Sequence, residues 1–423
     1  MNAKRLLTAA LLATAVAVGG TAVLLPAGSA YAQDKKKDAP KGDAVSAEMG
    51  KPLQAAQEAL KAKKYKDALA ALQQAEAAKA DKTPYEQFVL VQMRAAAYAG
   101  MQDYPNLVKA LEAMNDSGRL TQEQQLQQTV TIAQLQYQLQ NYDKAIETIN
   151  KYYAAGGQDQ QLNLLKGQAY FLKNDFANSA KTLQTVIKAQ EAGGRQPDEQ
   201  LLQTLMSAEY KQNNAQGTAA ALEKLVTYYP KPDYWTDLVT FTQKKPGFSD
   251  RLTLDVYRLM MATNTMTRPG DYMEAAQLAL QAGLPGEANA IVEKGMATKI
   301  MGQGADADRH RRMLDLATKQ AAEDQKTLAQ NEKEAANQPN GIALIKLGEA
   351  YASYGQYDKA VAMMQQGLAK GGLKNPDDAK LRAGVVMLQA GKRAEAEKVM
   401  KSIAAKDGSA DLARLWLLAT KKA

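Results

Sequence analysis

The side chains that most often carry catalysis or bind metals are scarce in this chain. Its 423 residues include one histidine, His310, and no cysteine. Paired histidine ligands for zinc and reactive thiolates are therefore absent from the sequence. A Ser-His-Asp arrangement could use only His310, which lies in the polar segment DRHRRM without a glycine-rich nucleophile turn nearby. We expect a solvated surface histidine and assign no catalytic residue.

Two short motifs just before His310 are similar to ligand sites but lack the parts that such sites need. Gly302-x-Gly304 follows a predicted helix instead of a strand, and no Lys-Ser/Thr pair comes after it to meet a phosphate. Asp306 and Asp308 stand two residues apart without the glycine-centred loop of a calcium site, and acidic residues are common where a helix begins. We expect no cofactor and no metal.

Composition favours helices as the elements that position these residues. Apolar residues make up 46% of the chain but aromatic residues only 6%, and alanine and glutamine are abundant. That bias is typical of helix formers and not of the β-branched and aromatic residues of strands. The sequence therefore predicts an all-α fold.

The charge balance gives little support to a nucleic-acid partner. The formal net charge is +8, of which Lys4 and Arg5 supply two, so the chain from residue 33 onward carries +6. The one compact basic run, Lys35–Lys37, is flanked by Asp34 and Asp38. Nucleic-acid binding needs clustered positive charge, which this run does not provide. We expect no nucleic-acid partner.

Residues 1–32 have the features of a targeting segment. Lys4 and Arg5 precede a largely apolar run from Leu6 to Leu25, then Pro26 and an A-x-A cleavage site ending at Ala32. We expect a signal peptide that is removed after Ala32, leaving no stable membrane span and placing the protein in the periplasm or outside the cell. The run is also long enough to remain as a membrane anchor, because about 20 apolar residues suffice.

The stretch from Ile342 to Pro376 shows the repeating element most clearly. Leu344, Leu347 and Tyr351 share the one-face spacing of a helix, and the same spacing follows Tyr357. Between these two helices Gly355 can take the left-handed conformation that ends a helix. The stretch therefore predicts a helical hairpin, with Gly348 and Ala360 small where its two helices approach each other.

These residues resemble the tetratricopeptide repeat, which has Leu-Gly, a tyrosine three further on, a Gly-x-Tyr turn and an alanine in the second helix. The resemblance implies a right-handed α-solenoid of about ten such hairpins. Their second helices would begin at nine recognisable positions: Tyr65, Tyr104, Tyr142, Phe176, Gln216, Phe248, Pro285, Tyr357 and Arg393.

The distance from Pro285 to Tyr357 is twice the 36-residue period that separates Gly348 from Gly384. We expect a tenth, less recognisable hairpin in this interval, with its turn near Lys319 to Ala321. The alternative is one long helix over residues 306–338, which contain neither glycine nor proline. We prefer two helices, because one helix of roughly 50 Å would leave the stacked array.

Four regions follow from this reading. After the signal segment, residues 33–50 form a flexible linker rich in charge and small residues, and order begins near Pro52. Residues 51–408 form the repeat array. Arg251 stands where a hairpin has alanine, so we expect a bend there. Residues 409–423 form a capping helix with Ser409 as its N-cap, because a solenoid must cover its last apolar face.

In the resembling family the first helices line a concave groove that binds peptides or partner helices. That geometry implies a partner-binding groove lined by Gln134, Tyr137, Gln138, Gln168, Phe171, Leu172, Ala208 and Lys211. Amides can hydrogen-bond an extended segment, and aromatic rings supply contact area. The alternative is that the rings only pack against neighbouring helices. The hairpin from Ile342 to Pro376 would offer Ile345, Glu349 and Ala352, which suggest no particular ligand.

Together these features predict a non-catalytic periplasmic scaffold that binds a protein or peptide partner. Two other functions stay open. The array could instead support the assembly of envelope polysaccharide or peptidoglycan, although glycan sites usually combine aromatic rings with carboxylates. It could also be an enzyme that relies on carboxylates alone. The sequence assigns no partner by name and no oligomeric state.

Overall fold

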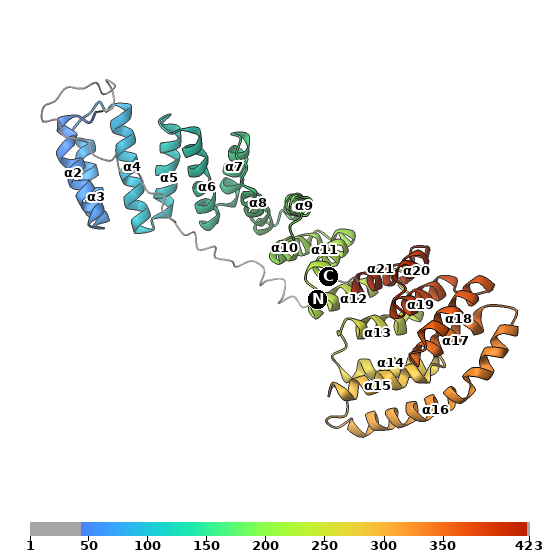
Figure 1. Ribbon diagram of the computed structural model, residues 1–423. Coiled ribbons are helices and arrows are strands. Elements are labelled where there is room, and N and C mark those ends of the chain that lie inside the picture. Colours follow the sequence, from blue (N-terminus) through green and yellow to red (C-terminus); the bar gives the residue numbers. More distant parts are fainter. Residues whose placement is uncertain (1–43, 421–423) are drawn as a thin grey trace. The chain divides into compact units, whose positions relative to one another are not determined.

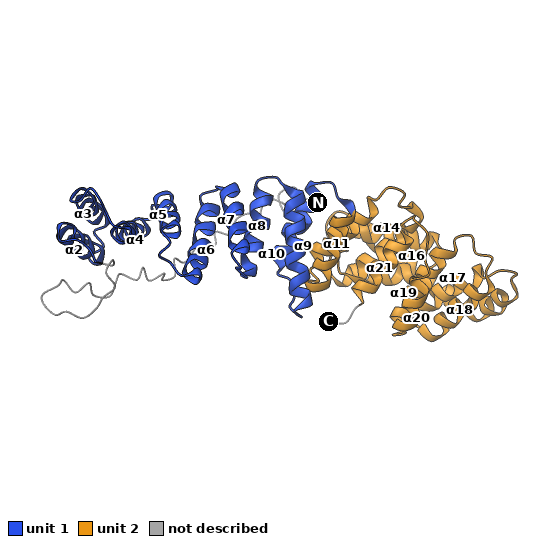
Figure 2. Ribbon diagram, turned by 90° about the horizontal axis from the view of Figure 1, so that it is seen from above, with its two compact units in different colours: residues 1–215 blue, residues 216–423 orange. Residues whose placement is uncertain are grey.

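The computed structural model describes residues 44–420, which form 20 α-helices and one short 3-10 helix, with no strand among them (Figure 1). The predicted all-α fold is confirmed. The predicted signal peptide and most of the predicted linker lie outside the described residues. The chain divides into two compact units, Met1–Ala215 (unit 1) and Gln216–Ala423 (unit 2) (Figure 2).

Unit 1 consists of four helical hairpins followed by one more helix. The hairpins are α2 (Ala47–Lys61) with α3 (Tyr65–Ala77), α4 (Pro84–Met101) with α5 (Tyr104–Asp116), α6 (Gln122–Gln138) with α7 (Tyr142–Ala154), and α8 (Gln160–Leu172) with α9 (Phe176–Ala192); α10 (Glu199–Lys211) follows. Within each hairpin the two helices pack together, and the second helix of one hairpin packs against the first helix that follows it. This is the stacking expected of a helical-repeat array.

The hairpin turns share one backbone feature. A residue in the left-handed region stands two positions before the second helix, as at Gln140, Asn174 and Gly355. The predicted left-handed conformation of Gly355 is confirmed, with φ of 73°. Such a residue ends the first helix within one turn and lets the chain reverse.

The two helices of a hairpin approach most closely at small residues. A Cβ atom on Gly348 would lie 2.8 Å from Met364 Cγ and 3.1 Å from the carbonyl oxygen of Ala360. A Cβ atom on Gly167 would lie 2.4 Å from a methyl group of Leu183. Both glycines stand at the same place in their hairpins, so the predicted close approach at Gly348 is confirmed.

Unit 2 also consists of helical hairpins, but one long helix, α16, stands between two of them. Its helices are α11 (Ala215–Tyr228), which begins at the unit boundary, α12 (Pro232–Gln243), η2 (Asp250–Leu252), α13 (Thr253–Ala262), α14 (Pro269–Gln281), α15 (Pro285–Ala297), α16 (Ala307–Asn337), α17 (Ile342–Ser353), α18 (Tyr357–Lys370), α19 (Pro376–Gln389), α20 (Arg393–Met400) and α21 (Ser409–Ala419).

The predicted tenth hairpin is wrong, because α16 is a single helix of 31 residues. It buries Ala317, Ala321, Leu328 and Ala335 on one stripe and leaves charged residues on its other sides. The helix does not leave the array, since it packs against α14 and α15 near one end and α17 near the other (Figure 1). One long helix thus covers two successive hairpins.

Several predicted boundaries shift. Helix α2 begins at Ala47, so residues 47–50 are helical and Pro52 lies inside the helix. The helix that directly follows α10 begins at Ala215 and not at Gln216. Phe248 precedes α13 by five residues, since a 3-10 turn at Asp250–Leu252 intervenes. The hairpin that contains Arg251 therefore departs from the repeat pattern at its turn.

The last helix, α21, packs against α19, α20 and α13. Its N-cap is Gly408 and not Ser409, and the carboxylate of Asp407 accepts hydrogen bonds from the backbone and hydroxyl of Ser409 at 3.0 and 2.7 Å. At the other end of α21, Arg393 donates to the carbonyl oxygens of Leu417 and Thr420, each at 3.0 Å. Because α13 is the second helix of the unit's first complete hairpin, the end of unit 2 meets its beginning.

Candidate functional site

The predicted groove residues lie on the first helices of successive hairpins in unit 1. Gln134, Tyr137 and Gln138 are on α6, and Gln168, Phe171 and Leu172 are on α8. All six are at least partly exposed. Helix α6 contacts α8, and α8 contacts α10, so these side chains belong to neighbouring helices as the repeat register requires.

The two aromatic residues of this set are each held by the aromatic residue that opens the second helix of the same hairpin. Tyr137 and Tyr142 meet edge to face with ring centroids 5.6 Å apart. Phe171 and Phe176 do the same at 5.4 Å. Burial, with a smaller contribution from Tyr142, raises the pKa of Tyr137 to about 12. The rings therefore pack within the array and also keep part of their surface exposed.

Helix α10 fits the predicted groove less well. Lys211 is exposed at the end of the helix, but Ala208 is fully buried. The prediction that Ala208 lines the groove is wrong. It fails because α10 buries most of the residues between Leu201 and Glu209, so little of its surface is left for a partner. The partly exposed residues of α6 and α8 form the more continuous set.

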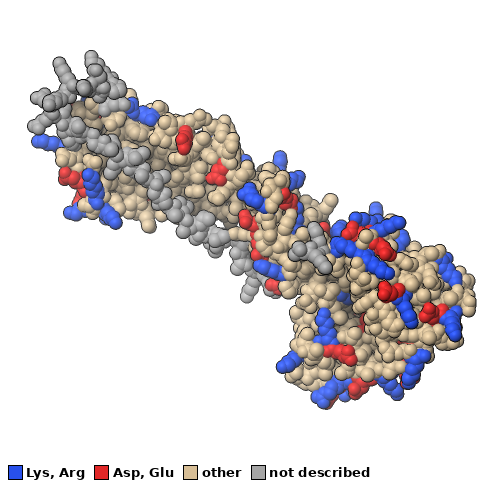
Figure 3. Space-filling model, in the orientation of Figure 1, with Lys and Arg blue, Asp and Glu red and all other residues tan. Residues whose placement is uncertain are grey.

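The surface of unit 1 differs from that of unit 2 in charge on the face shown in Figure 3. Over the visible part of unit 1 most atoms belong to uncharged residues, whereas lysine, arginine and acidic residues are spread over unit 2.

His310 is not a surface residue. Its exposed fraction is 3%, and its Nδ1 accepts a hydrogen bond of 3.0 Å from the backbone N–H of Gly302. The expectation of a solvated histidine is wrong, because the segment around Gly302 folds back onto the first turn of α16. Gly302, with φ of 80°, and Gly304 make this turn possible. The histidine fixes a loop and meets no second catalytic group.

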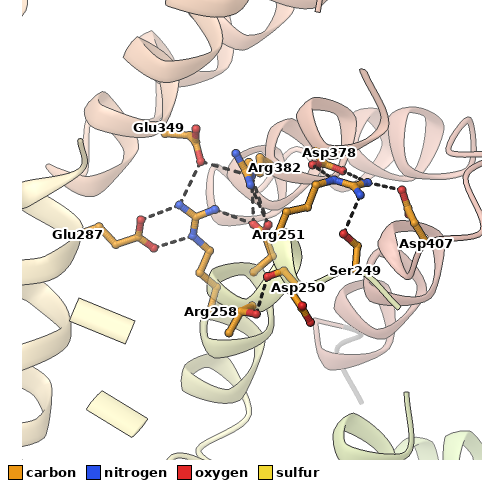
Figure 4. Close-up of polar contacts among 11 residues, drawn as sticks. Ser249, Asp250, Arg251, Arg258, Glu287, Glu349, Asp378, Arg382 and Asp407 are labelled. Carbon is orange, nitrogen blue, oxygen red and sulfur yellow. Dashed lines mark hydrogen bonds and ion pairs between the residues drawn. The ribbon is translucent and has the colours of Figure 1, made fainter. Parts of the chain in front are cut away.

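The densest group of charged side chains lies inside unit 2 and centres on Arg258 of α13 (Figure 4). Its guanidinium donates to both carboxylate oxygens of Glu287 at 2.6 Å, to Asp255 at 2.7 Å and to Glu349 at 3.1 Å. Burial by itself would lower the pKa of Arg258, but the three carboxylates raise it well above its usual value. The arginine is therefore a permanently charged link between α13, α15 and α17.

Two further arginines extend this group. Arg382 of α19 donates to Asp255 at 3.1 Å and lies 3.7 Å from Glu349. Arg251 donates to both oxygens of Asp378 at 2.8 and 3.0 Å and also contacts Asp407 (Figure 4). Arginine matches carboxylates in this two-pronged way better than lysine does. These contacts join α13 and the turn before it to α19 and the loop before α21.

The sequence signalled only part of this network. Arg251 stood out because it replaces an alanine, and Glu349 was placed on the inner face of its hairpin. In the structure Glu349 is almost fully buried and pairs with Arg258, and Ile345 is buried in the core. Asp255, Glu287 and Arg382 were not found. Each is one charged residue beside an apolar helix face, and the pairs they form span up to 127 residues.

Within residues 44–420, no group of three histidine, aspartate or glutamate side chains could hold a metal ion. No helix in that range is both long and apolar enough to cross a membrane. In the charged group around Arg258 the carboxylates are paired with arginines, and these pairs join α13, α15, α17 and α19.

No protein-family model matches the chain, and no curated protein matches its sequence. Several solved structures do. A tetratricopeptide repeat protein from Parabacteroides merdae is 10% identical, covers 81% of this chain and all of its own, and has a TM-score of 0.31. The P58(IPK) TPR domain is 14% identical, with 84% and 99% covered and a TM-score of 0.23.

Yeast Tom70 is 11% identical, with 88% of this chain and 95% of its own covered and a TM-score of 0.24. At such identities and scores these matches say nothing of this chain's partner. The hairpin geometry itself identifies the architecture. Leu-Gly in the first helix, the left-handed turn, the aromatic residue after it and the close approach at Gly348 give the chain the fold of a tetratricopeptide-type helical repeat.

Proposed function

We propose that this protein is a non-catalytic scaffold of the cell envelope that binds an extended polypeptide segment on the face of unit 1 formed by α6 and α8. The observation that carries the proposal is a repeated unit on that face. Tyr137 and Phe171 occupy equivalent positions, each is braced by the aromatic residue that opens the next helix, and each stands three residues after a glutamine of its own helix.

The repeated unit suits a polypeptide for two physical reasons. A ring that is already braced loses little conformational freedom when a partner covers it, so its contact area contributes fully to binding. A glutamine side chain offers both a donor and an acceptor, which match the N–H and C=O groups of an extended backbone. Units one hairpin apart could then contact successive parts of the same segment.

The envelope location rests on the sequence of residues 1–32 and on the absence of cysteine. The proposal is that this segment directs export and is then cleaved after Ala32. Amino-terminal sequencing of the protein recovered from the producing cells tests this part. A mature chain that starts at Gln33 supports export, whereas an intact Met1 would show that the segment is retained.

The binding face is tested by placing a photo-crosslinking amino acid at Gln138, which is exposed on α6, or at Lys181, which is exposed on α9. In living cells Gln138 should give a discrete crosslinked protein, and Lys181 should not. A crosslinked product that resists proteases but is degraded by glycan hydrolases would show that the partner is a polysaccharide and not a polypeptide. No product at Gln138, or equal products at both positions, would contradict the proposal.

A quantitative test then uses the crosslinked partner. Gln138→Glu with Gln168→Glu keeps the size of the side chains but removes their donors and adds charge, so affinity should fall at least tenfold. The matched control is Gln74→Glu, an exposed glutamine on the second helix α3. Equal affinities for the two proteins would show that the partner binds elsewhere.

A further inference from the structure

Unit 2 contains a cavity of about 500 Å³ beside the arginine network, and the cavity is open to solvent. Five helices, α13, α15, α17, α19 and α21, contribute its walls, together with the start of α18. Its size is that of a site for a small molecule, since such sites commonly measure about 300–1,000 Å³. Helix α21, which packs against α13 and α19, contributes Trp416 to the lining.

One part of the cavity wall is apolar. Met261, Ile291, Val386 and Trp416 line it, and Trp416 is 4% exposed. Tyr357, which is 36% exposed, also lines the cavity, so the space reaches solvent. A ligand here would place an apolar body against aliphatic side chains and an indole ring, which favours burial of its hydrocarbon part.

The carboxylates of the wall are already paired. Glu287 accepts two hydrogen bonds of 2.6 Å from Arg258, one on each oxygen. Glu349 accepts from Arg258 at 3.1 Å and lies 3.7 Å from Arg382. A cationic ligand would have to compete with guanidinium groups that cannot lose their charge, which is unfavourable.

The donors of the wall, in contrast, are not all used. Lys294 donates one hydrogen bond to the carbonyl oxygen of Met261 at 3.0 Å, and an ammonium group has three donors. Arg382 uses Nε and Nη2 on Asp255, and its Nη1 has no partner among residues 44–420. Trp416 Nε1 is buried and has no hydrogen-bond acceptor in the described part of the chain.

The cavity lining holds more cations than carboxylates. Three cations, Arg258, Lys294 and Arg382, line the cavity together with two carboxylates, Glu287 and Glu349, so the lining carries +1. Asp255 holds both arginines but does not line the cavity. Counted with Asp255 these groups are neutral overall, so the wall offers spare N–H donors and one cation, Lys294, whose hydrogen bond goes to a carbonyl oxygen and not to a carboxylate.

We propose that this cavity binds a small amphipathic carboxylate, whose anionic group meets Lys294 and Arg382 and whose apolar body packs against Trp416 and Ile291. A buried carboxylate needs a countercharge and several hydrogen-bond donors, and this wall supplies both. The site is distinct from the face of α6 and α8, so it stands or falls independently of the proposed function.

The test uses decanoate as the probe, with the full mature chain carrying Trp235→Phe so that Trp416 is the one tryptophan left. Decanoate should change the fluorescence of Trp416 saturably. Decanol and decyltrimethylammonium have a similar apolar body without the anion and should bind at least tenfold more weakly. No saturable change with decanoate, or equal affinity for all three probes, would overturn the proposal.

Two substitutions complete the test. Lys294→Met keeps the apolar stem, removes the charge and should weaken decanoate binding at least tenfold while leaving decanol binding unchanged. Lys319→Met, on the exposed side of α16, is the matched control and should have no effect. Ala290→Leu, which fills the cavity, should weaken all binding. Circular dichroism verifies that each variant is folded, and unchanged decanoate affinity in folded Lys294→Met would contradict the assignment.

Discussion

In unit 1 the ion pairs join residues of one hairpin or of successive hairpins, whereas in unit 2 they also join residues far apart in the sequence. Arg94 contacts Glu76 and Lys173 contacts Asp143, each between the second helix of one hairpin and the first helix of the next. In unit 2, Arg251 contacts Asp378, 127 residues further on, and Lys245 contacts Asp411, 166 residues further on.

This difference separates two ways of stabilising a repeat protein. An open array such as unit 1 gains stability from each hairpin and its neighbours, so a local change has a local effect. In unit 2 the first complete hairpin and the last helix contact each other, so a change at either end should alter the stability of both ends.

Both tryptophans, Trp235 and Trp416, lie in unit 2. Tryptophan fluorescence therefore reports on unit 2, and circular dichroism reports on both units.

The largest effect is expected for Arg258→Met. The substitution leaves Asp255, Glu287 and Glu349 without their common partner, and loss of one member of a buried charge network typically costs about 3–5 kcal/mol. Urea unfolding followed by tryptophan fluorescence should show this loss in unit 2. The control is Arg311→Met, whose pair with Asp308 is exposed and which should change stability by less than about 0.5 kcal/mol. Equal stability of Arg258→Met and the control would contradict the network's role.

A nearly equal effect is expected in unit 1 at acidic pH. Glu86 is fully buried, and it accepts hydrogen bonds from the backbone N–H groups of Thr83 and Ser46 and from Lys79. Burial by itself would raise the pKa of Glu86, but these bonds lower it to about 2. The folded chain therefore binds this proton less readily than the unfolded chain. The stabilisation is fully present above the unfolded pKa and is lost as the pH falls through about 2.

The expected loss is about 3 kcal/mol, from the difference between the folded and unfolded pKa values. Urea unfolding followed by circular dichroism at several pH values between 6 and 2 measures it. Glu86→Gln should be less stable at neutral pH and should lose less on acidification. Glu58→Gln, at an exposed position of α2, is the control. A Glu86→Gln protein with the same pH dependence as the parent chain would show that the carboxylate contributes nothing.

A smaller effect is expected at the loop before α16. His310→Ala leaves the N–H of Gly302 without its acceptor in a partly buried loop, which should cost about 1–3 kcal/mol in unit 2. His310→Gln keeps an acceptor within reach and should recover part of the loss. Tryptophan fluorescence in urea measures both variants. Unchanged stability of His310→Ala would restore the expectation of a surface histidine.

The smallest effect is expected for Tyr137→Leu. The substitution keeps an apolar side chain but removes the edge-to-face contact with Tyr142, which is worth about 0.5–1.5 kcal/mol. The loss should be visible by circular dichroism and absent from the fluorescence transition of unit 2. Tyr210→Leu, at an exposed residue of α10, is the control. A shift in the fluorescence transition would show that the two units do not unfold separately.

The sequence predicted the hairpins because their signals are local. A left-handed residue, an aromatic residue two positions later and a small residue opposite it are all found within one period. The same local signals could not decide between a hairpin and one helix at residues 307–337. That choice depends on whether Ala317 and Leu328 find separate neighbours in α15 and α17, which is a matter of tertiary packing.

The site was predicted even less completely, for a related reason. Tyr137 and Phe171 were found because the repeat register places them. Both interpretations of these rings stay open, since each ring packs against a neighbouring ring and is also partly exposed. The pairs of Arg258 and Arg382 could not be found from the sequence, because single charged residues give no sign of which distant helix holds their partner. His310 was wrongly predicted to be exposed, because its neighbours in the sequence are polar and give no sign that one side of α16 packs against the loop at Gly302.

Hydrogen exchange of α13 in a chain that ends at Gly408 tests most directly whether the two ends of unit 2 hold each other. Without α21, the amides of α13 should lose protection, although they lie about 150 residues before the truncation, while α6 in unit 1 should exchange as in the full chain. If protection were lost only in α19 and α20 and α13 stayed as protected as before, unit 2 would be an open array like unit 1.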